Sequence, residues 1–139
     1  MLKPLQISAA LLMIATSAQA QLLSINVQTQ TSEGSIRAAI FEGQSAFDTD
    51  KAVTFAVAQS QAGGTKLTFP ALTKGTYGIA LFQDKNGNET LDRNLLGAPK
   101  EPFGFSNNPK IGFSAPKFDA FKFEFDGDDM ALNITLNGS

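Results

Sequence analysis

The sequence predicts an all-β protein, namely an immunoglobulin-like or transthyretin-like sandwich of two sheets with about seven strands. Three observations lead to this prediction. Apolar and polar residues alternate over short runs, Gly, Asn, Asp and Pro bound these runs, and no segment has the period of an amphipathic helix. Two sheets are expected because a single twisted sheet of this size would leave its apolar face in water.

The first two alternating runs, residues 23–27 and 36–40, are separated by the turn-like stretch TSEGS, and together they predict a β-hairpin. Runs at residues 53–57, 67–69 and 77–81 predict three further strands. Between the first two of these runs, a Gly-Gly pair predicts a turn. Only Ser45 to Lys51 could hold a short helical turn.

Near the C-terminus the alternation is clearest. Phe121, Phe123 and Phe125 interleave with charged residues, the stretch DGDD follows, and residues 130–136 alternate again. We therefore expect a second hairpin with one wet face and one dry face. The chain has twelve phenylalanines and no tryptophan, so the phenylalanines that alternate on strands are expected to form the core.

The stretch LTKGTY, which ends at Tyr77, has the spacing Leu-x-x-Gly-x-Tyr. It resembles the pattern that enters a central strand in transthyretin-like and carboxypeptidase-regulatory-like sandwiches. The resemblance implies a structural corner, in which the tyrosine hydroxyl bonds the backbone.

Residues 1–20 have the layout of a secretory signal peptide, with a positive charge at Lys3, an apolar run and a final Ala-Gln-Ala. Cleavage after Ala20 would leave one domain, residues 21–139, exported to the periplasm or secreted and without a transmembrane segment. The net charge of -2 gives no electrostatic footprint for nucleic acid or anionic lipid. Because the chain has neither Cys nor His, disulfides, thiol catalysis and a Ser-His-Asp triad are excluded.

The stretch DKNGNETLD carries oxygen-bearing side chains at alternate positions, as calcium-binding loops do. It departs from the hand-type loop because glycine comes early and the twelfth position holds Leu95 instead of glutamate. Two interpretations stay open: a weak calcium site, and a β-turn whose side chains cap nearby amides. The candidate ligands are Asp84, Asn86, Asn88, Thr90 (through its carbonyl) and Asp92.

A long segment rich in Pro, Gly and Phe, residues 96–118, follows this loop and interrupts the alternation. We expect it to be ordered and to share one end of the sandwich with the preceding loop. Aromatic faces beside amides suit the recognition of a peptide or glycan, while the alternative is a self-packed loop that covers the core. The candidate ligand-binding residues are Phe103, Phe105, Asn107, Asn108 and Phe113.

Two motifs of the sequence resemble those of a widespread family of small exported bacterial proteins classed as a domain of unknown function. They are G-T-Y-x-I-A-L-F-x-D-x-N-G-N, from Gly75 to Asn88, and G-F-S-N-N, from Gly104 to Asn108. The resemblance covers essentially the whole chain after the signal peptide. It implies a bacterial source and a β-sandwich, and it implies no established activity.

For function, the sequence predicts a non-catalytic binding or interaction module at the bacterial envelope, with calcium as its possible cofactor. The expected partner is an envelope protein, a peptide or a glycan. One alternative is a hydrolase that uses a metal-bound water at Asp84, Glu89 or Asp92. Another is a structural accessory that stabilises envelope partners through its sheet edges.

Overall fold

The structure is a computed structural model, and it describes residues 21–70 and 72–138. The signal peptide predicted at residues 1–20 therefore lies outside the described residues. Within the described part, no helix has both the length and the apolar character needed to cross a membrane.

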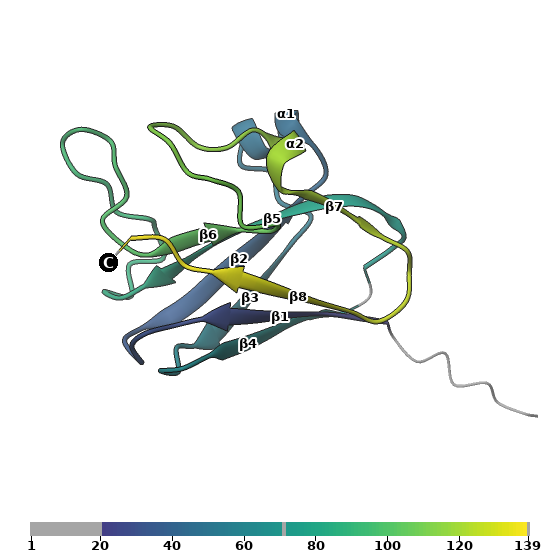
Figure 1. Cartoon of the computed structure of the whole chain (residues 1–139), viewed down its shortest axis with the longest axis horizontal. Coiled ribbons are helices and arrows are strands. Elements are labelled where there is room, and N and C mark those ends of the chain that lie inside the picture. The colour runs from purple at the N-terminus through teal and green to yellow at the C-terminus, as the bar shows by residue number, and fades with distance from the viewer. Residues whose placement is uncertain (1–20, 71, 139) are drawn as a thin grey trace, which may run out of the picture.

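The described chain is mostly β-structure, which confirms the predicted fold class, with eight strands instead of about seven (Figure 1). The strands are β1 (Leu22–Gln28), β2 (Ser35–Phe41), β3 (Thr54–Gln59), β4 (Thr65–Pro70), β5 (Gly75–Asp84), β6 (Phe103–Phe105), β7 (Lys122–Phe125) and β8 (Met130–Thr135). Two short helices, α1 (Gln44–Asp48) and α2 (Phe118–Phe121), accompany them. The predicted helical turn thus corresponds to α1.

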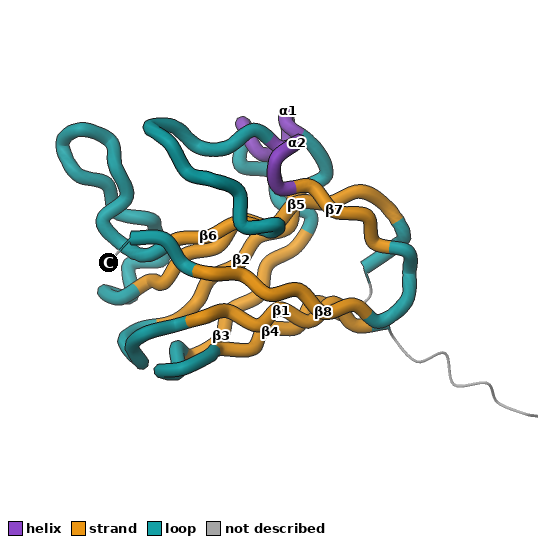
Figure 2. The backbone as a smooth tube through the Cα atoms, in the orientation of Figure 1, coloured by secondary structure: helices purple, strands orange, loops and turns teal. Residues whose placement is uncertain are grey.

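The strands form two sheets that pack as a sandwich. One sheet has three strands in the order β4-β1-β8, and the other has five, in the order β3-β2-β5-β6 with β7 also paired to β5. Strands β6 and β7 pair with successive parts of the same edge of β5. Strand β6 pairs with Ala80 to Phe82, and β7 pairs with Gly75 to Gly78. Figure 2 shows the strands as two layers, with most long loops at one end.

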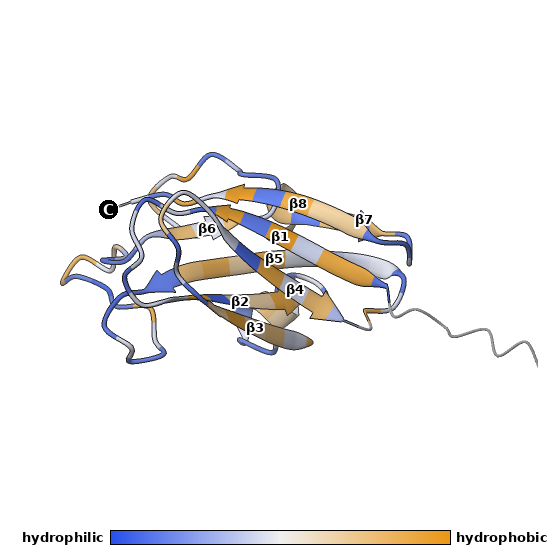
Figure 3. Cartoon of the chain, turned by 90° about the horizontal axis from the view of Figure 1, so that it is seen from below, coloured by the Kyte–Doolittle hydropathy of each residue, from blue (hydrophilic) through white to orange (hydrophobic). Residues whose placement is uncertain are grey.

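Alternate residues of both sheets form the main core. Leu23, Ile25 and Val27 of β1 face the core from the three-stranded sheet, and Ile36 and Ile40 of β2 face it from the other. This is the period of two that the sequence shows, so the alternation identifies the buried residues correctly. Figure 3 shows hydrophobic residues along the strands and hydrophilic residues in much of the connecting loops.

The two predicted hairpins are wrong. Strand β1 does not pair with β2; it lies between β4 and β8, and β2 belongs to the other sheet. Likewise β7 pairs with β5, whereas β8 pairs with β1 in parallel. The physical reason is that a connection arching from one sheet to the other buries the same alternate residues as a hairpin within one sheet. Alternation alone therefore does not identify a strand's neighbour.

A second, smaller core lies on the outer face of the five-stranded sheet. It contains Phe41, Phe105, Phe118 and Phe121, with Phe47 of α1 packed against them. The Phe47 ring meets those of Phe41 and Phe121 edge-on, at centroid distances of 5.3 and 5.1 Å. Phe121, predicted in a strand, is instead the last residue of α2. The two helices thus shield the aromatic residues on this face of the sheet from water.

The tyrosine corner has the predicted form. The Tyr77 side chain is buried, and its hydroxyl donates a hydrogen bond to the Thr73 carbonyl at 2.8 Å. It also lies 3.2 Å from the Thr73 hydroxyl. The corner fixes the start of β5, the strand whose other end carries Asp84.

Candidate functional site

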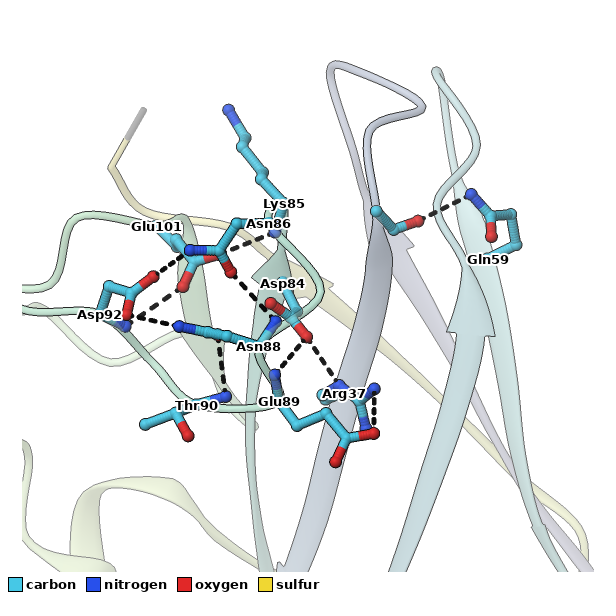
Figure 4. A network of polar contacts seen from close by, with 11 residues as sticks. Arg37, Gln59, Asp84, Lys85, Asn86, Asn88, Glu89, Thr90, Asp92 and Glu101 are labelled. Atoms are coloured by element: carbon cyan, nitrogen blue, oxygen red, sulfur yellow. Dashed lines mark hydrogen bonds and ion pairs between the residues drawn. The ribbon is translucent and has the colours of Figure 1, made fainter.

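Strand β5 ends at Asp84, whose side chain is completely buried (0% exposed). Its Oδ2 accepts hydrogen bonds from Arg37 Nε and from the Glu89 backbone N–H, both at 2.9 Å. Arg37 lies on the neighbouring strand β2, two residues from the position that pairs with Asp84, and its guanidinium also contacts Glu89 Oε1 at 3.2 Å. Figure 4 shows this ion-paired base of the loop. The other carboxylate oxygen, Asp84 Oδ1, is buried and has no hydrogen-bond partner among the residues that the structure describes.

The predicted metal ligands Asn86, Asn88 and Asp92 do come together. The Asn86 and Asn88 amides donate to the two oxygens of Asp92 at 2.5 and 2.7 Å. Their side-chain oxygens accept from backbone N–H groups two residues further on, those of Asn88 and Thr90. The loop is therefore a pair of consecutive Asx turns whose amides face one carboxylate, which is the geometry of the turn interpretation.

Glu101, which sequence reasoning missed, closes this loop. Its side chain is only 6% exposed, and its carboxylate accepts from the Lys85 N–H at 2.7 Å and from the Asp92 N–H at 3.2 Å. It lies just before β6, so it ties the end of the long connection to its beginning. No local spacing rule identifies such a residue; a glutamate beside Pro102 before an aromatic strand was the only available sign.

The two amides also set the acidity of Asp92. Hydrogen bonds from Asn86 and then Asn88 hold the pKa of the Asp92 carboxyl below its ordinary value of 3.8, because they stabilise the charged form. Partial desolvation acts in the opposite direction, and the positive charge of Lys100 adds a smaller lowering of the pKa.

Within residues 21–70 and 72–138, no three acidic side chains lie close enough to form a metal-binding group by themselves. Asp84, Asp92 and Glu101 are instead interleaved with amides and backbone N–H groups. A cation held here would need amide or carbonyl oxygens in addition to carboxylates, which is the ligand mixture that calcium accepts.

The predicted ligand-binding residues have different surroundings. Phe105 is buried in the second core, and Phe103 is half-buried with its ring edge-on to Phe105. Asn107 donates to the Lys122 carbonyl at 2.6 Å, while Asn108 donates to the Asn133 carbonyl and accepts from the Thr135 N–H. Only Phe113 is fully exposed, at 114%.

The G-F-S-N-N segment thus joins the two sheets. Asn107 and Asn108 have φ angles of 65° and 47°, in the left-handed region that asparagine tolerates. Ser106 is fully buried; its hydroxyl accepts from the Ile79 N–H and donates to the Phe121 carbonyl. Phe103 also exchanges backbone hydrogen bonds with Asn137, beyond β8. These contacts connect β5 and α2 with the exposed edge of β8.

The two loops were expected to share one end of the sandwich, and they do so only in part. Phe103 pairs with Phe82, close to Asp84, but Phe105 pairs with Ala80, because β6 runs back along β5. Asn107 and Asn108 are consequently bonded to β7 and β8 and not to the Asp84 loop. The antiparallel direction of β6 carries the segment away from that end.

Among the described residues, large apolar side chains that are more than half exposed occur at three places. Leu95 (106% exposed) and Leu96 (94%) lie in the β5–β6 connection, and Phe113 lies in the β6–α2 connection. These two loops project beyond the five-stranded sheet on the same side in Figure 1. On edge strand β3, Phe55 is 66% exposed, so the expectation that strand phenylalanines form the core is wrong for this residue. It points away from the core because Ala56 and Ala58 occupy the inward positions.

A pocket of about 150 Å³ lies near Gln83 and Thr31, where the β1–β2 connection meets the end of β5. Gln83 is buried there, and its amide donates to the carbonyls of Thr31 and Glu33. Sites for organic ligands are usually about 300 to 1,000 Å³, so this pocket suits water or a small ion better than a substrate.

Fold and site together define an all-β sandwich with an acid-rich polar loop at the end of its central strand. A family model described as "Uncharacterized protein conserved in bacteria (DUF2141)" matches residues 25–133, and the chain belongs to this family. The match confirms the resemblance that the two motifs indicated. No curated protein and no solved structure matches the chain.

Proposed function

We propose that this protein is a non-catalytic interaction module of the bacterial envelope, and that it docks the tips of two loops on an anionic lipid surface. The observation that carries the proposal is the full exposure of Leu95, Leu96 and Phe113 in these loops. Large apolar side chains exposed together on loops that project from a rigid sandwich are typical of an interaction surface.

The charges of the two loops support a lipid partner. The stretch RNLLGAPK, residues 93–100, contains two cations and no acid, and so does KIGFSAPK, residues 110–117. The positive charge is confined to the tips, since Asp92 and Glu101 flank the first stretch and Asp119 follows the second. Cations around an exposed apolar tip match a surface with negative headgroups above an apolar interior.

The expected energies are sufficient for reversible binding. Transfer of one leucine or phenylalanine side chain out of water contributes roughly 1.5 to 3 kcal/mol when it is complete, and each cation near an anionic surface contributes about 1 kcal/mol. Three side chains and four cations, each acting in part, therefore give a weak and salt-sensitive attachment.

The ion pairs at the base of the Asp84 loop weaken the hydrolase alternative. The carboxylates of Asp84 and Glu89, two of its three candidate groups, both form ion pairs with Arg37. The predicted peptide or glycan site retains Phe113 as an exposed ring, while the amides of Asn107 and Asn108 are already bonded to the chain. The proposal therefore keeps Phe113 and adds Leu95 and Leu96.

The test is co-sedimentation of the purified protein with phosphatidylethanolamine–phosphatidylglycerol vesicles in the presence of a chelator. We expect binding at ~0.1 M NaCl that is largely lost at ~0.5 M, because salt screens the cations. A variant with Leu95→Ser and Leu96→Ser should bind at least about tenfold more weakly, since it loses two apolar contacts. The variant Lys110→Gln with Lys117→Gln should bind about tenfold more weakly at low salt.

Two matched controls separate the tips from the rest of the surface. Phe55→Ser removes an exposed aromatic residue from β3, and Lys66→Gln removes an exposed cation from β4. Neither should change vesicle binding. Equal loss in Phe55→Ser and in the leucine variant, or no vesicle binding by the unaltered protein, would exclude the lipid proposal. Binding to a peptide or glycan library that depends on Phe113, without vesicle binding, would favour the second partner class.

A specific observation also favours a structural role through a sheet edge. Strand β3 is an edge strand, and residues 52–61 carry no charge although Val53, Phe55 and Val57 are exposed. Edge strands of monomers usually carry charges that prevent strand pairing. If β3 pairs with a second copy or a partner, Phe55→Lys should shift the molecular mass measured by light scattering toward that of the monomer.

A further inference from the structure

The buried carboxylate of Asp84 is only half satisfied by the chain. Its Oδ2 has two donors, but Oδ1 is inaccessible to solvent and has no donor within residues 21–70 and 72–138. An anionic oxygen buried in this way is costly, and such atoms usually bind a water or an ion that is not part of the polypeptide. In Figure 4 the free oxygen points away from Arg37 and toward the side of the loop where Asn86 and Glu101 lie.

Two of the four acids of this connection, Asp92 and Glu101, form no ion pair with another described residue, although the positive charge of Lys100 lowers the pKa of Asp92. Asp84, Glu89, Asp92 and Glu101 all belong to the same connection, and Arg37 supplies the only guanidinium bound to them in the described part of the chain. The ammonium group of Lys85 lies 3.9 Å from Glu33 instead. A divalent cation would give Asp92 and Glu101 the ion-pair partner that they lack.

We propose that the segment from Asp84 to Glu101 binds one calcium ion, and that Glu101 supplies the acid that the sequence pattern of the loop lacks. Asp84 Oδ1, Asp92 and Glu101 would provide carboxylate oxygens, and Asn86 and Asn88 would provide amide oxygens. Because the three carboxylates lie too far apart to hold an ion in this structure, the loop would contract around it. The Thr90 carbonyl and water complete the six to eight oxygens that calcium takes. Sequence spacing predicts the first ligands, and the fold adds Glu101 through its bonds to Lys85 and Asp92.

The amide groups show how the ion would enter. The two NH2 groups of Asn86 and Asn88 now lie against the Asp92 oxygens, where they act as partial positive charges. A half-turn of each amide about its Cβ–Cγ bond exchanges the NH2 group for a carbonyl oxygen. Asp92 would then face a cation instead of two donors. The half-turn also takes the acceptors away from the Asn88 and Thr90 N–H groups, so the two Asx turns open when the ion binds.

The choice of calcium follows from the donor set. The chain contains no histidine or cysteine, which disfavours zinc and copper. Magnesium requires nearly ideal octahedral geometry and sheds water reluctantly, whereas calcium tolerates an irregular set of amides, carbonyls and carboxylates. With only three carboxylates, we expect a dissociation constant on the order of 10⁻⁴ to 10⁻³ M, as in extracellular calcium modules.

The experiment is a titration of the purified, chelator-treated protein with CaCl2, followed by thermal melting and by the side-chain amide resonances of asparagine. We expect calcium to raise the melting temperature and to shift the NH2 resonances of Asn86 and Asn88, with a smaller effect from MgCl2. Glu101→Gln should raise the dissociation constant at least about tenfold, since it removes one charged ligand. Asp128→Asn, which changes an exposed acid in the β7–β8 connection, should leave binding unchanged.

Asp84→Asn should also abolish binding, but it weakens the ion pair with Arg37 and with it the base of the loop. Glu101→Gln and Asp92→Asn therefore decide the question, because their melting without calcium shows whether each is folded. The proposal is overturned if ~10 mM calcium shifts neither the melting temperature nor the two amide resonances. It is overturned equally if Glu101→Gln responds to calcium as the unaltered protein does. Vesicle binding is measured with a chelator, so the lipid and calcium proposals can fail independently.

Discussion

At the scale of single residues, the base of the Asp84 loop depends on contacts between positions far apart in the sequence. Local spacing predicts Asp84, Asn86, Asn88 and Asp92 together, because all four lie within nine consecutive residues of one loop. It does not reveal Arg37, which reaches Asp84 across the β2–β5 pairing. The contacts of a side chain were thus predictable where its partners are neighbours in sequence, and they were not predictable where strand pairing brings the partners together.

Gly34 illustrates such a position. Its φ angle is 65°, and a Cβ atom built there would lie 1.8 Å from the Asp84 carbonyl oxygen. Gly34→Ala should therefore lower the free energy of unfolding by roughly 3 kcal/mol or more, since both backbone strain and a backbone clash oppose it. Urea denaturation measures the change.

Gly63→Ala is the matched control for that substitution. Gly63 has a φ angle of 93°, but nothing lies within 4 Å of its added Cβ. Its unfolding free energy should fall only by about 1 to 2 kcal/mol, the cost of a left-handed alanine. Equal losses for the two variants would mean that β2 and β5 can separate enough to relieve the clash.

The lowered pKa of Asp92 predicts how the loop responds to acid. Because the folded state holds this pKa below 3.8, the charged carboxylate stabilises the fold fully above that pH. The contribution is lost as the pH falls below 3.8 through the folded pKa. The melting temperature of Asp92→Asn should thus be lower than that of the unaltered protein at pH 6, and the two should converge at acidic pH, with a chelator present throughout.

A gap that stays constant down to low pH would contradict this effect. Asp128→Asn serves as the control, because the side chain lies in an exposed turn and accepts no hydrogen bond from another side chain in the described residues. Its melting temperature should follow that of the unaltered protein at each pH.

At the scale of elements, alternation shows which side chains are buried but not which strands are neighbours. Leu23 to Val27 and Ile36 to Ile40 bury alternate residues as predicted, and yet they lie in different sheets. Helix α2 was missed because its last residue, Phe121, is in phase with Phe123 and Phe125 and so extends the alternation of the strand that follows. An element this short has too few residues to show a helical period.

The second core predicts a large effect for one residue of α2. Phe121 is fully buried, and its ring lies 5.1 Å from those of both Phe47 and Phe105. Phe121→Ala should lower the free energy of unfolding by about 3 to 5 kcal/mol, because it leaves a cavity among several aromatic rings. Chemical denaturation provides the measurement.

Phe113→Ala is the comparison, because this phenylalanine is fully exposed. It should change the free energy of unfolding by no more than about 0.5 kcal/mol. If Phe121→Ala were equally mild, the helices would be dispensable covers and the second core would contribute little to stability.

At the scale of the whole molecule, the predicted architecture is confirmed and its connectivity differs. A sandwich follows from two facts that the sequence contains: many short alternating runs and an excess of apolar residues over what one sheet can bury. The order of strands does not follow, because Thr29 to Gly34 and Asp126 to Asp129 fit either a hairpin turn or an arch. The exposed residues of the two loops could be predicted from the sequence only in part, because their exposure depends on which loops project beyond the sheet.

The parallel pairing of β1 with β8 has a consequence for how the chain reaches its folded state. Leu23 lies opposite Met130, so the first described strand can complete its sheet only after the last strand has been synthesised. The three-stranded sheet therefore closes across almost the entire chain, a non-local step of the kind that slows folding. While a growing chain is still being synthesised, the free edge of β1 remains open to other strands, and only the arrival of the C-terminal residues covers it.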